Sequence, residues 1–136
     1  MLDHTDMRIL EELSNNSRLS MKELGAKVHL TGPAVSARVM KLEDEGVIEG
    51  YSIKLNQAKL GYFVHAFITI ITKSTHHAPY LSFLKTQEGN IVRNYKISGD
   101  GCYLLECKFP SNEILNTFLE ELNEHANYKL SIVIGK

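Results

Sequence analysis

Residues 20–42 read SMKELGAKVHLTGPAVSARVMKL, and this stretch decides the fold of the first part of the chain. Ser20 and Glu23 form a capping box that opens a helix, because the hydroxyl accepts a first-turn amide while Glu23 accepts the amide of Ser20. The chain breaks at His29–Leu30, and Thr31 can then cap a second helix. Two helices joined by so tight a turn predict a helix-turn-helix.

The sequence on either side extends this motif. Residues 5–14 carry an apolar stripe at helical spacing and predict a first helix, for which Thr5 is the expected N-cap. Gly46 ends the third helix, and Val47–Asn56 then alternates apolar and polar residues, which predicts a strand at the position of a wing. Three helices, a tight turn and a strand together describe a winged helix-turn-helix.

The rest of the chain has a mixed pattern of strands and helices. We expect a winged helix-turn-helix domain over residues 1–50, a linker strand over 51–61 and a second domain over 62–136. The second domain is predicted to contain, in order, a strand at 63–73, a helix at 77–87, strands at 91–98 and 102–109, a helix at 113–125 and a strand at 129–134. The order βαββαβ predicts an α+β, ferredoxin-like domain.

The charge balance is unusual for a protein that binds nucleic acid. The net charge is −1 over 136 residues, and residues 1–55 carry seven Lys and Arg against nine Asp and Glu. Val28–Leu42, however, contains two bases, Arg38 and Lys41, and no acid. Any DNA-binding surface is therefore expected to be a local face and not a field spread over the whole molecule.

Nothing in the sequence points to a membrane or to an oxidising compartment. The N-terminus MLDHTDMRIL has early acids and lacks the apolar stretch of a signal peptide, and the most apolar run, residues 63–71, is too short to span a bilayer. Cys102 and Cys107 are the only cysteines. Five residues apart on a strand they would point to opposite faces, so we expect no disulfide and a cytoplasmic protein.

The third predicted helix offers a candidate DNA-reading face. A rotation of about 100° per residue places Pro33, Ala37 and Lys41 opposite the apolar stripe of this helix. Such a face either reads the major groove or is an ordinary solvated surface, and the order of the elements favours the groove. Arg38 lies on the flank, where it either contacts a phosphate or pairs with an acid such as Glu45. The predicted DNA-contacting residues are Arg18, Ser20, Lys22, Thr31, Pro33, Ala34, Ser36, Ala37, Arg38 and Lys41.

A spaced set of residues also indicates a family. The set comprises Leu2-Asp3, Asp6, Ile9-Leu10, Leu13, Ser17-Arg18-Leu19-Ser20, Glu23-Leu24-Gly25, Val35, Arg38, Leu42-Glu43, Gly46-Val47-Ile48-Glu49-Gly50-Tyr51 and Leu60-Gly61. With these residues the chain resembles the leucine-responsive regulator/AsnC (Lrp/AsnC) family of transcription regulators over its whole length. The resemblance implies a winged helix-turn-helix joined to a ferredoxin-like effector and assembly domain. It also implies double-stranded DNA as a partner, homo-oligomers in which dimers build octamers, and amino-acid effectors.

Two positions depart from the pattern of that family. His29 stands in the turn where the family commonly has glycine, and histidine adopts a positive φ at some strain. The effector loop, which in the family resembles G-x-x-D-Y, is here Gly99-Asp100-Gly101-Cys102-Tyr103. Cys102 replaces the acid that would hold the amino group of a ligand, and Asp100 is out of register. We therefore expect weak or absent sensing of ordinary amino acids.

No catalytic, cofactor or metal site can be assembled from the sequence. His76 and His77 are adjacent in a predicted loop, where their side chains diverge, and no third ligand is evident. Cys102 lacks a recognisable His/Asn constellation and is expected to be a buried structural cysteine. We expect a protein that is not an enzyme. The alternative is a small-molecule-binding or enzymatic βαββαβ protein whose N-terminal helices serve assembly alone.

Overall fold

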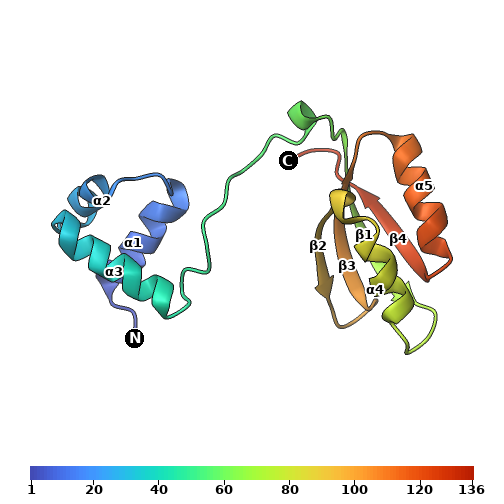
Figure 1. The fold of residues 1–136 in the computed structure, drawn as a ribbon, viewed down its shortest axis with the longest axis horizontal. Coiled ribbons are helices and arrows are strands. Elements are labelled where there is room, and N and C mark those ends of the chain that lie inside the picture. The colour runs from blue at the N-terminus through green and yellow to red at the C-terminus, as the bar shows by residue number, and fades with distance from the viewer. The chain divides into compact units, whose positions relative to one another are not determined.

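The computed structural model describes residues 1–136, which form two compact units, residues 1–54 and residues 55–136 (Figure 1). The first unit contains three helices: α1 (His4–Asn15), α2 (Met21–Val28) and α3 (Gly32–Asp44). Its core is made of seven buried residues, namely Ile9, Leu13, Leu24, Val28, Val35, Val39 and Leu42. These are the apolar positions at helical spacing, so the predicted helix-turn-helix is confirmed. No helix of either unit is long and apolar enough to cross a membrane.

The predicted caps hold at two of the three helices. The Ser20 hydroxyl accepts the Glu23 amide at 3.0 Å, and the Ser20 amide donates to the Glu23 carboxylate at 3.1 Å. Thr31 accepts from the amide three residues on, at 3.3 Å. The expected cap at Thr5 is wrong. Helix α1 begins earlier, because Asp3 accepts the Asp6 amide at 2.7 Å and Asp6 accepts the Asp3 amide at 3.1 Å, a second capping box.

His29 makes the turn of the helix-turn-helix. It adopts φ 61° and ψ 41°, the left-handed conformation, and it is the sole non-glycine residue of the chain with a positive φ. In this conformation its amide donates to the carbonyl of Gly25, as does the amide of Leu30 at 2.9 Å. The prediction of a turn that tolerates histidine at a positive φ is confirmed.

Replacing His29 with glycine is expected to raise the free energy of unfolding of the first unit. The left-handed conformation costs an L-residue about 1–2 kcal/mol, and the greater freedom of glycine in the unfolded chain offsets part of this, which leaves a gain of about 0.5–1 kcal/mol. Urea titration followed by circular dichroism measures the change. His29→Ala is the control, because it removes the imidazole but keeps the strain. Equal stability of the two variants would show that φ strain is not the cause.

The predicted strand over Val47–Asn56 is absent. The amides of Val47 and Ile48 donate to the carbonyl of Leu42 at 2.9 and 3.1 Å, which closes α3, and Gly46 ends the helix with φ 74°. Beyond this point residues 49–56 belong to no helix or strand and pair with no other strand. The alternating apolar side chains of the segment, Tyr51, Ile53 and Leu55, are all exposed. An extended segment becomes a strand only beside a hydrogen-bonding partner, and one chain does not provide that partner here.

The second unit has the predicted βαββαβ order. Its elements are β1 (Val64–Thr72), α4 (Ala78–Lys85), β2 (Ile91–Lys96), β3 (Tyr103–Phe109), α5 (Asn112–Asn123) and β4 (Ala126–Ile132), with 3₁₀ turns at Ala58–Leu60 and Glu88–Asn90. The sheet order is β2-β3-β1-β4, and every neighbouring pair is antiparallel. This is the predicted ferredoxin-like arrangement. The main difference is β4, which begins at Ala126 and not at residue 129.

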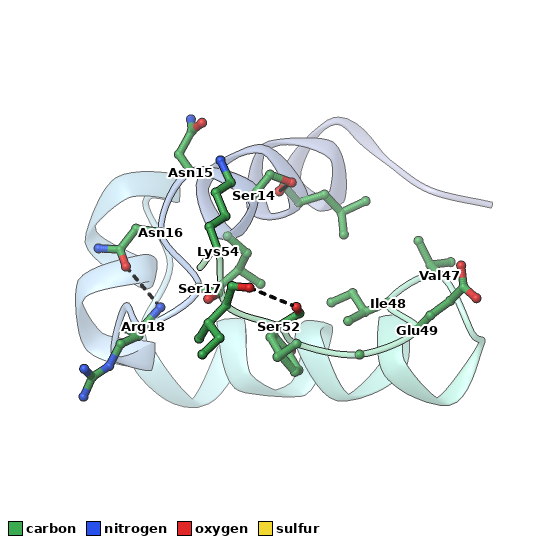
Figure 2. Close-up of a pocket in the computed structure, with 15 residues that line it drawn as sticks. Ser14, Asn15, Asn16, Ser17, Arg18, Val47, Ile48, Glu49, Ser52 and Lys54 are labelled. Carbon is green, nitrogen blue, oxygen red and sulfur yellow. Dashed lines mark hydrogen bonds between the residues drawn. The ribbon is translucent and has the colours of Figure 1, made fainter. Parts of the chain in front are cut away.

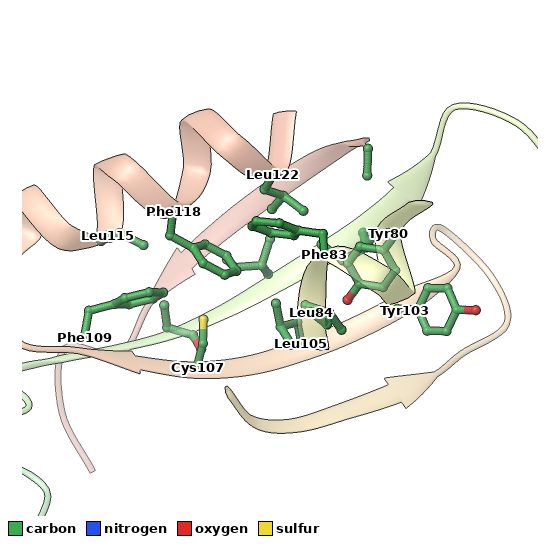
Figure 3. Packing of buried hydrophobic residues seen from close by; sticks show 14 of the residues in the cluster. Tyr80, Phe83, Leu84, Tyr103, Leu105, Cys107, Phe109, Leu115, Phe118 and Leu122 are labelled. Carbon is green, nitrogen blue, oxygen red and sulfur yellow. The ribbon is translucent and has the colours of Figure 1, made fainter. Parts of the chain in front are cut away.

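Helices α4 and α5 cover one face of this sheet. Alternate residues of β1 and β3 are buried beneath them, and the residues between are only half-buried. Figure 3 shows Phe118 of α5 between Phe83 of α4 and Phe109 of β3, with ring centroids 5.3 and 5.1 Å apart. The other face has no covering layer within the unit. There Phe67 and His65 lie beside Glu106, and the imidazole Nε2 is 2.6 Å from the carboxylate.

Candidate nucleic-acid interface

Helix α3 presents the face that the sequence predicts. Pro33, Ala37 and Lys41 are exposed opposite the buried stripe, while Ala34 and Ser36 are half-buried beside it. Sequence reasoning missed one contributor, Met40, whose side chain is 58% exposed. The same helical rotation places Met40 near Pro33, so the signal was present in the pattern. The exposed face therefore offers mainly apolar atoms and one ammonium group.

Arg38 is engaged within the protein. Its Nη1 lies 2.8 and 2.6 Å from the two carboxylate oxygens of Asp3 and 3.1 Å from Asp6. Of the two roles expected for Arg38, a phosphate contact or a pair with an acid such as Glu45, the structure shows pairing, but with Asp3 and Asp6 at the start of α1. Glu45 lies 4.0 Å from Lys41. Because the guanidinium of Arg38 donates to it, the pKa of the Asp3 carboxyl is held below its usual value.

The start of α2 lies close to the start of α3. A Cβ built on Gly32 would be 3.8 Å from the backbone nitrogen of Lys22, so the two helix N-termini are neighbours. Arg18, Ser20 and Lys22 are all exposed there, and Thr31 caps α3 beside them. The structure therefore brings together the predicted phosphate-contacting residues and the beginning of the predicted reading face.

A groove opens between α1 and the extended segment that follows α3. Its volume is about 650 Å³, and it is lined by the end of α1, the α1–α2 loop and residues 47–54. Figure 2 shows Arg18 and Lys54 toward one end and Glu49 toward the other. Lys54 was not among the sequence-predicted contacts, because it falls in what the pattern presents as a linker strand.

The predicted effector residues lie in the other unit: Gly99–Cys102 are in the loop between β2 and β3, and Tyr103 is the first residue of β3. Gly99 and Asp100 are exposed at the tip of this loop, and Gly99 has φ 98°. The loop is anchored on β1, because the amide of Cys102 donates to the carbonyl of Ile70 at 2.7 Å. Tyr103 is buried, and its hydroxyl lies 3.0 Å from a ring nitrogen of His77.

Cys102 differs from its prediction. It is half-buried and not buried, and it precedes β3 instead of lying within it. Its Sγ is 3.4 Å from the hydroxyl of Thr72, and this hydrogen bond lowers the pKa of the thiol. The fully buried cysteine is Cys107, where burial raises the pKa of the thiol to about 12. No three His, Cys, Asp or Glu side chains are grouped so that they could hold a metal ion.

A helix-turn-helix whose second helix, α3, has an exposed face, joined to a ferredoxin-like unit, is the architecture of a DNA-binding transcription regulator. Residues 2–49 match the family model described as winged helix-turn-helix DNA-binding. The chain is 62% identical to the HTH-type transcriptional regulator LrpA of Bacillus subtilis (strain 168), with all 136 residues aligned and both chains covered completely. The chain therefore belongs to the Lrp/AsnC family.

Solved structures agree with this assignment. The structure of B. subtilis LrpC is 34% identical, has a TM-score of 0.92, and aligns over 100% of this chain and 96% of that one. The feast or famine regulatory protein of M. tuberculosis, solved in complex with L-methionine, is 25% identical with a TM-score of 0.90 and covers 100% and 94% of the two chains. The whole chain, and not its helix-turn-helix alone, thus has the architecture of the family.

Proposed function

We propose that this protein is an oligomeric, non-enzymatic regulator of the cytoplasm that recognises double-stranded DNA largely through its shape. The observation that carries the proposal is the composition of the exposed α3 face. Arginine, lysine, asparagine and glutamine are the side chains that read guanine or adenine by paired hydrogen bonds, and only Lys41 is exposed there. Arg38, on the flank, is held by Asp3 and Asp6.

Because few side chains on the α3 face can read the bases directly, we expect specificity to depend on how easily the DNA deforms. A good bidentate contact contributes about 1–3 kcal/mol of discrimination, and each module offers very few. Several modules on one assembly can instead favour sequences that bend at low energetic cost. We expect bendable or A·T-rich sites with a loose consensus and half-sites one helical turn or multiples apart. A selection from random DNA that returned a long, sharp, G·C-rich consensus would contradict this proposal.

Fluorescence anisotropy with a labelled duplex, at low and moderate salt, tests DNA binding itself. A steep loss of affinity with salt is expected, because the contacts to phosphate release counterions. The alternative function is a small-molecule-binding βαββαβ protein whose N-terminal helices serve assembly. That alternative predicts no DNA binding even at low salt.

Lys41→Ala is expected to weaken binding to all sequences nearly alike. The side chain is 71% exposed, and its one acidic neighbour, Glu45, is 4.0 Å away, so the ammonium group can reach DNA. Loss of one phosphate contact should reduce the slope of log affinity against log salt by about 0.9 per engaged protomer. Binding measured on an A·T-rich and a G·C-rich duplex distinguishes the outcomes. A loss confined to one duplex would identify Lys41 as a base reader instead.

Assembly into dimers, and of dimers into octamers, is supported by surfaces that one chain leaves uncovered. The sheet face with Phe67 and Leu104 has no layer over it, and the extended segment carries Tyr51, Ile53 and Leu55 in the open. Units of fewer than about 80–90 residues also have small cores. Light scattering at micromolar concentration tests the assembly, and a monomer would contradict it.

We expect little response to ordinary amino acids, although a structural relative was solved with L-methionine. An α-ammonium group needs a carboxylate partner, and Cys102 stands where the family pattern has one. Asp100 is exposed at the loop tip, away from that register. We propose that Gly99–Tyr103 instead serves contacts between dimers. Titration calorimetry with pooled amino acids provides the test, and tight binding that is lost when the loop is altered would refute the expectation.

A further inference from the structure

The basic side chains of the DNA-binding unit divide into two groups. Four of the seven Lys and Arg of residues 1–54 have partners within the unit: Arg8 donates to the Lys27 carbonyl at 2.7 Å, Lys27 lies 3.9 Å from Glu12, Arg38 contacts Asp3 and Asp6, and Lys41 lies 4.0 Å from Glu45. The other three, Arg18, Lys22 and Lys54, have no carboxylate within 4.0 Å. Arg8 also lacks a carboxylate partner, but its guanidinium is held by the Lys27 carbonyl, so these three are the basic side chains left without any partner in the unit.

Two of these unpaired cations share one groove. Arg18 and Lys54 both line the groove of about 650 Å³ between the α1–α2 loop and residues 47–54. They lie toward the same end of it in Figure 2, and the acid of the groove, Glu49, lies toward the other. Ser17 and Ser52 line the same groove and add hydroxyl groups, of which that of Ser52 donates to the Ile53 carbonyl at 3.5 Å. The third cation, Lys22, lies outside the groove, where its backbone is next to the start of α3.

We propose that a DNA backbone lies along this end of the groove, with Arg18 and Lys54 each binding a phosphate and the serine hydroxyls donating to the same strand. The inference rests on the proposed DNA-binding function and adds to it a contact outside the helix-turn-helix. Lys54 then belongs to the DNA surface and not to a passive linker. Unpaired cations suit this role, because a paired one must first give up its carboxylate before it neutralises a phosphate.

The salt dependence of DNA binding by the full-length protein tests the proposal. We would measure anisotropy of a labelled mixed-sequence duplex between about 50 and 200 mM salt for wild type, Arg18→Gln, Lys54→Gln and the double variant. Each single variant is expected to lose about fivefold in affinity near 150 mM, with a slope reduced by about 0.9 per engaged protomer. The double variant should show about the product of the two losses.

Lys27→Gln is the matched control, because it makes the same charge change in the same unit at a lysine of α2 that lies outside the groove and outside the exposed face of α3. Its slope should stay at the wild-type value.

Wild-type slopes in Arg18→Gln and Lys54→Gln would overturn the groove contact while leaving the DNA-binding function intact. An equal loss in Lys27→Gln would overturn it too, in favour of a diffuse charge effect. Loss of affinity together with altered light scattering would assign the groove to assembly, and absence of wild-type binding would overturn both proposals.

Discussion

Gly25→Ala should lower the free energy of unfolding of the DNA-binding unit by about 2 kcal/mol. A Cβ at this position would lie 2.5 Å from the carbonyl oxygen of Leu30 and 3.3 Å from backbone carbon of Thr31. These atoms belong to the turn, which is fixed because the Leu30 amide donates to the Gly25 carbonyl. Crowding of this kind lowers the free energy of unfolding by about 1–3 kcal/mol, and we take the upper end because the contact is so short. The better helix propensity of alanine offsets about 1 kcal/mol of this loss.

The measurement is thermal unfolding of the full-length protein by scanning calorimetry. For so small a unit, about 2 kcal/mol corresponds to a fall in Tm of roughly 10–15 °C. Gly50→Ala is the control, because no atom lies within 4 Å of a Cβ placed there. Helix propensity alone predicts the opposite sign at Gly25, so an unchanged or raised Tm would show that the turn can open without cost. DNA affinity should fall in parallel, since this turn sets the angle of α3.

The features that could be predicted from the sequence are those determined by residues close together in the chain. The Ser20–Glu23 capping box and the left-handed turn at His29 depend on residues within a few positions of one another, and both are present in the structure. The buried stripes of the three helices follow from spacing in the same way. Such features are encoded where they occur, so reading them requires no knowledge of the rest of the fold.

The parts that were missed depend on distant or external groups. Arg38 pairs with Asp3, 35 residues away, and the nearer Glu45 was the only partner that helical spacing could suggest. The strand expected at Val47–Asn56 has the right pattern but no partner to complete it within one chain. Lys54 joins the groove because that same unpaired segment folds back past α1. Each of these outcomes depends on which groups are close together in space, and the periodicity of the sequence does not show this.

Phe118→Ala is expected to have the largest effect of any single change, because it should remove the assembly unit while sparing the DNA-binding unit. The ring is 2% exposed and contacts both Phe83 and Phe109, so its truncation leaves a cavity at the centre of the core. Such substitutions cost about 3–5 kcal/mol, against a total of roughly 4–12 kcal/mol for a unit of this size. Phe118→Leu refills much of the space and should cost far less.

Phe118→Ala should also weaken DNA binding, because the first unit contacts DNA while the second joins several copies of the chain. The first unit has its own core of seven residues, so its calorimetric transition should survive in Phe118→Ala. Affinity for DNA should nevertheless fall by about 10²–10⁴-fold, because modules that are no longer joined lose the effective concentration that multivalency supplies. Light scattering should report smaller particles for Phe118→Ala and wild-type particles for Phe118→Leu. If Phe118→Ala fell apart into monomers yet bound DNA as tightly as wild type, each helix-turn-helix would have to act alone, and the proposed reading of DNA by a multivalent assembly would be wrong.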